Sequence, residues 1–138
     1  MELQQRPRLL KKQTEIEEYL AFVPPTPHPF PVIASFDVFL LLSREDPFPL
    51  VALEAAYLHK PVLAFKGAGG IEDLVEEDAG TMVGFEDIDQ LCEAIYLYYQ
   101  NPDFATKTGK KASEKVKERY GVGIISSKLS ALIDTFVS

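Results

Sequence analysis

The chain has 138 residues, of which 46% are hydrophobic, which is enough for one domain with a sizeable core. Its 21 acidic and 14 basic residues give a net charge of −7, which argues against non-specific binding to nucleic acids or to anionic membrane surfaces. The single cysteine, Cys92, excludes an intrachain disulfide, and neither His28 nor His59 lies in a metal-binding spacing.

The sequence also lacks the features of a membrane or secreted protein. No apolar run approaches the ~20 residues that cross a bilayer, and the first residues lack the apolar core of a signal peptide. We therefore expect a cytoplasmic protein with no transmembrane segment and no nucleic-acid partner.

Residues 1–34 are predicted to form an amphipathic helix followed by a proline-rich connection. Apolar residues recur at near-helical spacing with charges between them, which predicts a helix over residues 3–20. A strand is also expected near residues 21–23. Five prolines at positions 24–31 then argue against a helix in the connection.

Residues 35–138 alternate short apolar runs with helical patterns and are predicted to form one α/β domain. The pattern is typical of a Rossmann-like parallel sheet with helices on both faces. Strands are predicted over residues 37–43, 61–65 and 79–84, and helices over 49–60, 69–77, 86–100, 104–120 and 122–136.

Two further expectations concern burial in this domain. The continuous apolar run Val38–Leu42 is typical of a strand buried on both faces. The lysines between positions 107 and 117 are interleaved with glutamates, which indicates a solvated helix face.

Two loops are expected to meet at the carboxyl edge of the sheet, where ligands bind in such folds. Residues 43–49 lead into a helix whose first amides, Leu50 and Val51, have no intrahelical acceptor and can hold a phosphate oxygen. Residues 66–70 are rich in glycine, which allows positive φ and close backbone approach. Because the glycines lack the spacing of a Walker loop or a dinucleotide fingerprint, an ordinary turn explains them equally well.

Two carboxylates flank the start of the helix that follows the first loop. Asp46 lies in the turn before it and Glu54 lies about one turn inside it, so both can accept hydrogen bonds from vicinal hydroxyls of a sugar nucleotide. Structural roles explain the same residues. Asp46 can favour the start of the helix through its charge, and Glu54 can lie on a solvated face.

Three stretches in order carry a family resemblance: DVFLLLSREDPFPLVALEAAYLHKPVLAF, GAGGIEDLVEEDAG, and DIDQLCEAIYLYYQNPDF with its Asn-Pro break. Over about residues 35–120 the chain resembles the C-terminal, nucleotide-sugar-binding lobe of retaining glycosyltransferases with the GT-B fold, the group called family 4. The family signature is an acidic residue, seven others and a glutamate. It falls here on Asp46 and Glu54, with Glu45 just before it.

The resemblance implies a role for each matching position. Asp46 would hold hydroxyls of the donor sugar and stabilise positive charge developing at its anomeric carbon, and Glu54 would bind the ribose hydroxyls. Gly69 and Gly70 match the Gly-Gly loop near the donor. The other residues implied in donor binding are Glu45, Phe48, Pro49, Leu50 and Val51.

The chain departs from the family in two local features. The first signature residue is usually a glutamate, and Asp46 is one methylene shorter. The family usually has Gly-Gly-Ile-Pro-Glu where this chain has GGIED.

A complete enzyme of this kind also has an N-terminal acceptor-binding lobe and, early in the C-terminal lobe, an arginine and a lysine that neutralise the leaving diphosphate. Neither that lobe nor the family's strand ending in Gly-Arg, with the lysine that follows it, is found in this sequence. We therefore expect a truncated donor-binding lobe without transferase activity on its own. We expect a nucleotide-diphospho-sugar as donor substrate and no metal or other cofactor. The expected partners are a complementary N-terminal lobe or a second chain at an exposed sheet edge.

Two other functions remain open at this stage. One is a non-catalytic adaptor or regulatory lobe of the same fold. The other is a sugar-nucleotide epimerase-like enzyme, which needs an acid and a base in the crevice. His28 and His59 are the side chains that titrate near neutral pH, and His59 is expected at the far end of its helix.

Overall fold

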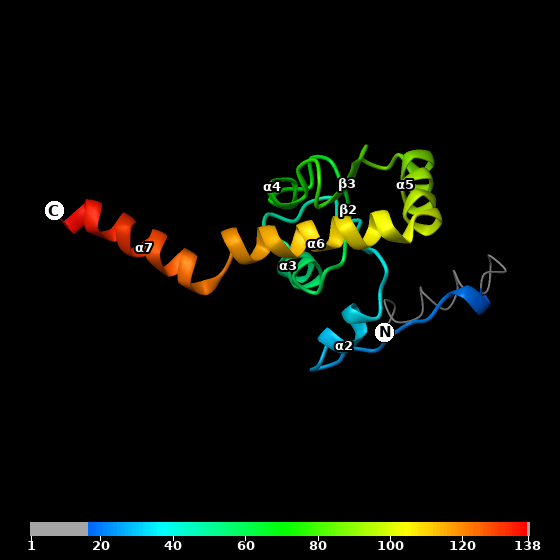
Figure 1. The fold of residues 1–138 in the computed structure, drawn as a ribbon, viewed down its shortest axis with the longest axis horizontal. Helices are drawn as coiled ribbons and strands as arrows, with labels where there is room; N and C mark the ends of the chain where they lie inside the picture. Colours follow the sequence, from blue (N-terminus) through cyan, green and yellow to red (C-terminus); the bar gives the residue numbers. More distant parts are fainter. Residues whose placement is uncertain (1–16, 138) are drawn as a thin grey trace.

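The computed structural model describes residues 17–137 as a three-stranded parallel sheet with helices on both faces (Figure 1). The strands lie in the order β1 (Phe39–Leu41), β2 (Val62–Phe65) and β3 (Gly80–Val83). A 3-10 turn, η1, covers Glu17–Tyr19, and most of the helix predicted over 3–20 lies outside the described residues. The helices are α2 (Phe30–Ala34), α3 (Leu50–Tyr57), α4 (Ile71–Val75), α5 (Ile88–Gln100), α6 (Pro102–Arg119) and α7 (Val122–Val137).

Each strand pairs in parallel with the next one along the chain. Phe39 of β1 lies opposite Val62 of β2, and Val62 lies opposite Gly80 of β3. Glycine is required at position 80 because a Cβ there would lie 1.9 Å from the carbonyl oxygen of Val62. The predicted parallel α/β architecture is therefore confirmed.

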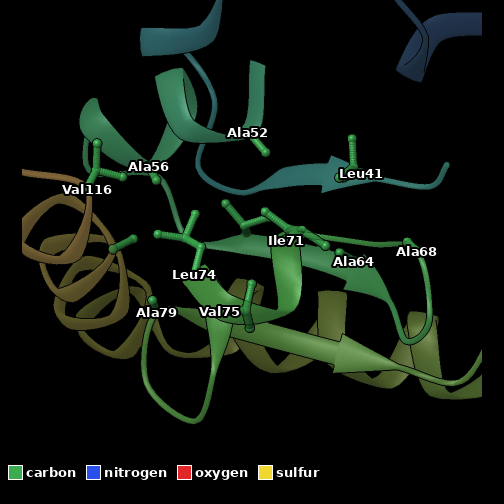
Figure 2. Packing of buried hydrophobic residues seen from close by; sticks show 12 residues of the cluster. Leu41, Ala52, Ala56, Ala64, Ala68, Ile71, Leu74, Val75, Ala79 and Val116 are labelled. Carbon is green, nitrogen blue, oxygen red and sulfur yellow. The ribbon is translucent and has the colours of Figure 1, made fainter. Parts of the chain in front are cut away.

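The central strand β2 divides the core into two clusters because alternate side chains point to opposite faces. Val62 and Ala64 belong to the larger cluster, which α3, α4 and α6 share (Figure 2). Leu63 and Phe65 belong to the smaller cluster with β3 and α5. All four side chains are buried, as expected for a parallel strand covered on both faces.

Strand β1 is shorter and more exposed than the sequence predicts. Of the apolar run Val38–Leu42, Leu41 is buried, but Leu40 is 40% exposed and Leu42 is 46% exposed. The expectation of burial on both faces is therefore wrong for β1. Its physical cause is that β1 is an edge strand of the described sheet, whereas β2 has a neighbour on each side.

A short helix, α2, lies where the prolines were expected to exclude one. Pro29 is its N-cap and Pro31 lies in its first turn, where a missing N–H breaks no helical hydrogen bond. The N–H of Ile33 donates to the carbonyl of Pro29 at 3.0 Å, and the Ile33 side chain is buried. The residues 21–23 expected as a strand have no regular structure.

The last two helices are placed very differently. Helix α6 crosses the sheet between α3 and α4, whereas α7 projects away from the domain (Figure 1). Five large apolar side chains of α7 are between 47% and 82% exposed, namely Ile125, Leu129, Leu132, Ile133 and Phe136. Within residues 17–137, no helix is both long enough and apolar enough to cross a membrane.

Candidate functional site

The loops after β1 and β2 are joined by backbone hydrogen bonds at the carboxyl edge of the sheet. The N–H of Asp46 donates to the carbonyl of Ala68 at 2.7 Å, and the N–H of Gly70 donates to the carbonyl of Pro47 at 3.2 Å. The prediction that these two loops lie side by side is therefore confirmed. We call this region, residues 43–49 with residues 66–70, the loop junction.

Two glycines permit this contact. Gly69 has a φ of 129°, and a Cβ on it would lie 2.3 Å from the carbonyl oxygen of Asp46. A Cβ on Gly70 would lie 2.7 Å from the carbonyl oxygen of Pro47. The close approach that these glycines permit is thus to the backbone of the first loop, and it fixes how the two loops sit against each other.

Helix α3 begins at the loop junction with open amide donors. Its N-cap, Pro49, is buried, and its carbonyl accepts from the N–H groups of Ala52 at 3.0 Å and Leu53 at 3.3 Å. The N–H groups of Leu50 and Val51 come before these and have no acceptor within the helix. Because both residues are exposed, the positive end of the helix dipole is open to an anion.

The predicted acidic residues lie around the start of this helix. Glu45 is exposed, whereas Asp46 and Glu54 are half-buried. Neither the Asp46 nor the Glu54 carboxylate forms a hydrogen bond or ion pair with another described residue. Asp46 is held in place through its backbone and Glu54 through the helix, so both carboxylates are available to a ligand.

Two cations at this edge were missed by the sequence reasoning. Arg44 follows β1, and its guanidinium lies 5.6 Å from the ring centroid of Phe85, which packs edge-on against Phe65 at 5.5 Å. Lys66 directly follows β2; its backbone N–H donates to the carbonyl of Val83 at 2.8 Å, and the residue is exposed. Their positions in the sequence could have indicated them, because each cation comes soon after the end of a predicted strand.

Neither histidine belongs to the loop junction. His59 follows the C-terminal end of α3, opposite to the end that carries Leu50. The backbone N–H of His28 donates to the hydroxyl of Thr26 at 3.1 Å in the exposed stretch before α2. An acid–base pair built on histidine is therefore not found where the two loops meet.

The structure buries one lysine that was expected on a solvated helix face. Lys115 is 8% exposed, and its ammonium lies 2.8 Å from Glu76 and 2.5 Å from Asp78. Arg119 donates to both carboxylate oxygens of Glu76, at 2.5 Å and 3.3 Å. The hydrogen bonds from Arg119 and Lys115 lower the pKa of Glu76 to about 2. The alternation of lysine and glutamate gave no sign of this because α4 is distant in sequence.

Comparison with known proteins identifies the family. Residues 2–115 match the family model described as Glycosyl transferases group 1. The chain belongs to this family. It is 28% identical over 114 residues to an uncharacterized glycosyltransferase of Haemophilus influenzae, and the match covers 82% of this chain and 32% of the relative. The chain thus spans about a third of the length of this relative.

Solved structures also share the fold of this chain. Sucrose-phosphate synthase from Thermosynechococcus elongatus superposes with a TM-score of 0.86 at 26% identity, over 96% of this chain and 34% of the other. HepE from Anabaena, in complex with UDP, superposes with a TM-score of 0.88 at 20% identity, over 95% of this chain and 36% of the other. The Rossmann-like fold of a GT-B lobe is therefore confirmed.

Proposed function

We propose that this chain is the donor-binding domain of a retaining glycosyltransferase of family 4, and that it binds a nucleotide-diphospho-sugar at the loop junction. The observation that carries the proposal is that the open start of α3 directly follows this junction, with the unengaged carboxylate of Asp46 before it and that of Glu54 about one turn inside the helix. HepE, whose fold this chain shares, was solved with UDP and with UDP-glucose, which supports a donor of this class.

The donor's diphosphate would bind at the N-terminal end of α3. The N–H groups of Leu50 and Val51 and the helix dipole attract its phosphate oxygens. Arg44 and Lys66 add positive charge at the same edge of the sheet. We expect these groups to neutralise the negative charge of the bound diphosphate without a resident metal ion.

The two carboxylates would hold the sugars on either side of the diphosphate. Glu54 accepts hydrogen bonds from the ribose hydroxyls, and Asp46 accepts them from the hydroxyls of the donor sugar, with Glu45 beside it. A hydrogen bond to a charged group contributes about 1.5–3 kcal/mol, so the loss of either carboxylate should weaken binding strongly. Gly69 and Gly70, which have no side chain, allow the second loop to lie against the backbone of Asp46 and Pro47.

The same groups would assist the transfer step. As the bond between the anomeric carbon and the diphosphate breaks, Asp46 stabilises positive charge at that carbon, and the start of α3 stabilises the departing diphosphate. The acceptor hydroxyl then attacks from the face that the diphosphate leaves and gives its proton to the departing diphosphate, so that the configuration is retained. The surface that holds the acceptor would come from a further lobe of a longer polypeptide or from another chain.

Calorimetric titration tests donor binding directly. The whole chain is titrated with UDP, GDP, ADP and their glucose conjugates, beside Glu54→Gln and the control Glu93→Gln, which alters an exposed glutamate of α5. We expect one nucleotide family to bind and Glu54→Gln to weaken it about tenfold or more, since one charged hydrogen bond is lost. The control should bind like the unaltered chain.

Two results would contradict the proposal. One is the absence of binding heat for every nucleotide in a sample whose melting is cooperative, which would favour the adaptor alternative. The other is binding that Glu54→Gln leaves unchanged, which would place the nucleotide away from α3. A thermal shift in the same samples provides a second readout, because a ligand of the folded state must raise its stability.

A further inference from the structure

Two cations of α6 hold the C-terminal end of α4. In addition to its ion pairs with Glu76 and Asp78, Lys115 donates to the carbonyl oxygens of Leu74 at 3.3 Å and Val75 at 3.4 Å. These four acceptors surround one ammonium group. They are the last two carbonyls of α4, of which that of Val75 also accepts from the N–H of Ala79 at 3.0 Å, and the carboxylates of Glu76 and Asp78.

Arg119 adds a second attachment one helical turn further along α6. It donates to the carbonyl of Asp73 at 3.0 Å and binds the Glu76 carboxylate through two nitrogens. Glu76 has a φ of 42°, a backbone conformation that is unfavourable for a residue with a side chain. Its carboxylate is thus fixed by two cations at the point where the chain leaves α4.

The ammonium of Lys115 keeps its charge in this position. Burial acts to lower the pKa of Lys115, but the hydrogen bonds to Asp78 and Glu76 outweigh it and raise the pKa above its usual value. Removing one partner of a buried ion pair is costly because it leaves the other charges uncompensated. The contacts of Lys115 therefore hold the end of α4 against α6.

Helix α4 transmits this position to the loop junction because it is only five residues long. Its N-cap is Gly70, whose N–H donates to Pro47 of the first loop. The carboxylate of Glu72, in the first turn of α4, accepts from the N–H of Gly67. A shift of α4 along its axis would therefore move the glycine loop.

The same half of α6 also contacts the other side of the site. The ring of Tyr120, just after α6, lies 5.9 Å from the ring of Phe48, in the loop that precedes α3. The hydroxyl of Ser113 donates to the carbonyl of Tyr57 at the C-terminal end of α3, at 3.0 Å. Both helices that begin at the loop junction are thus attached to one segment, residues 113–120, which comprises the end of α6 and Tyr120.

We propose that residues 113–120 brace the donor site, and that Lys115 and Arg119 are positioning residues that set the separation of the two loops without touching the donor. The part of this inference that concerns donor binding rests on the proposed function. Its structural part stands on the contacts of residues 113–120 with α4, α3 and the loop junction.

Amide hydrogen exchange tests the brace without any ligand. Lys115→Met keeps the apolar length of the side chain and removes its charge, and Lys111→Met, which removes an exposed ion pair with Glu114 on the same helix, is the control. We expect protection of the Asp46 and Gly70 amides to fall about tenfold in Lys115→Met, with protection in β2 less affected. A role in overall stability alone would instead reduce protection in β2 and leave the loop amides unchanged.

Nucleotide titration of the same variants tests what the brace is for. With the donor that the unaltered chain binds, the Kd of Lys115→Met should rise about fivefold or more at a temperature where it is fully folded, while Lys111→Met stays unchanged. If Lys115→Met does not fold, Arg119→Gln provides the same two measurements, because the Arg119 side chain is 41% exposed.

The outcomes separate the two proposals. If the loop amides keep their protection in Lys115→Met and in Arg119→Gln, the brace is overturned whether or not the chain binds a donor. If the loop amides lose protection and the donor affinity does not change, the positioning role is overturned and the proposed donor site stands. If the unaltered chain binds no donor, the proposed function fails, and the exchange data still decide the brace.

Discussion

Helices α6 and α7 follow one another in the chain, and their burial is the reverse of what their composition indicates. Helix α7 is the more apolar of the two, yet every side chain described between residues 122 and 136 is exposed. Helix α6 is rich in lysine and glutamate, yet it buries Thr108, Gly109, Ala112, Ser113, Lys115 and Val116. Burial in this molecule is therefore decided by which neighbours an element meets.

The small residues of α6 explain its position. Gly109 lies so close to the chain after α3 that a Cβ there would be 2.0 Å from the carbonyl oxygen of His59. Ala112 and Ser113 lie fully buried on the same side of the helix. Helix α7 has large apolar side chains instead, and they are exposed. The helix itself leads away from the domain (Figure 1).

The largest effect expected from this comparison is the difference between one glycine of α6 and one glycine of α7. Gly109→Ala should destabilise the chain by about 1–3 kcal/mol or more, because the added methyl meets backbone that cannot move aside. Gly123→Ala in α7 should cause no loss and a slight gain in helix content, since a Cβ there meets nothing within 4 Å. Urea unfolding and circular dichroism measure the two effects, and equal effects at both positions would contradict the comparison.

A smaller effect is expected from acid, through the contact between α4 and α6. The pKa of Glu76 is lowered to about 2 in the folded state, whereas a free glutamate titrates near about 4.3. The stabilisation is therefore fully present above about pH 5 and is lost as the pH falls toward 2.

Unfolding midpoints across this pH range test the expectation. Glu76→Gln should be less stable than the unaltered chain at pH 7, and the difference should shrink steadily below pH 5. Glu93→Gln, which removes an exposed carboxylate from α5, should follow the unaltered curve. A difference for Glu76→Gln that stays constant with pH would show that its ion pairs do not contribute.

The smallest effect is expected on the exposed face of α7. Changing Leu129 and Leu132 together to serine should alter the free energy of unfolding by no more than about 0.5 kcal/mol, because both side chains are already in water. Leu74→Ala, at a fully buried position of α4, should cost about 2–5 kcal/mol in the same urea experiment. A large loss in the α7 variant would show that this face is covered in solution.

The order of strands and helices could be predicted because its signals are local. The apolar run of β2, the Asn-Pro break before α6 and the glycines before α4 each act within a few residues. The meeting of the two loops followed from topology, since parallel strands end at one edge of the sheet.

The remaining features depend on contacts between distant residues. Leu40 has the sequence pattern of a buried strand, and its exposure follows from the place of β1 at the sheet edge. Lys115 resembles the other lysines of its helix until Glu76 and Asp78 are brought beside it. The available carboxylates of Asp46 and Glu54 matched the family signature, but their half-buried state required the structure.

Mapping amide chemical shifts on addition of the nucleotide-sugar that binds is the most direct test of the donor site. The site at the loop junction predicts that the largest changes at saturation lie at Leu50, Val51, Gly69 and Gly70, with Glu54 among the affected residues. Changes confined to other surfaces, such as the exposed face of α5, with these amides unaltered, would contradict it.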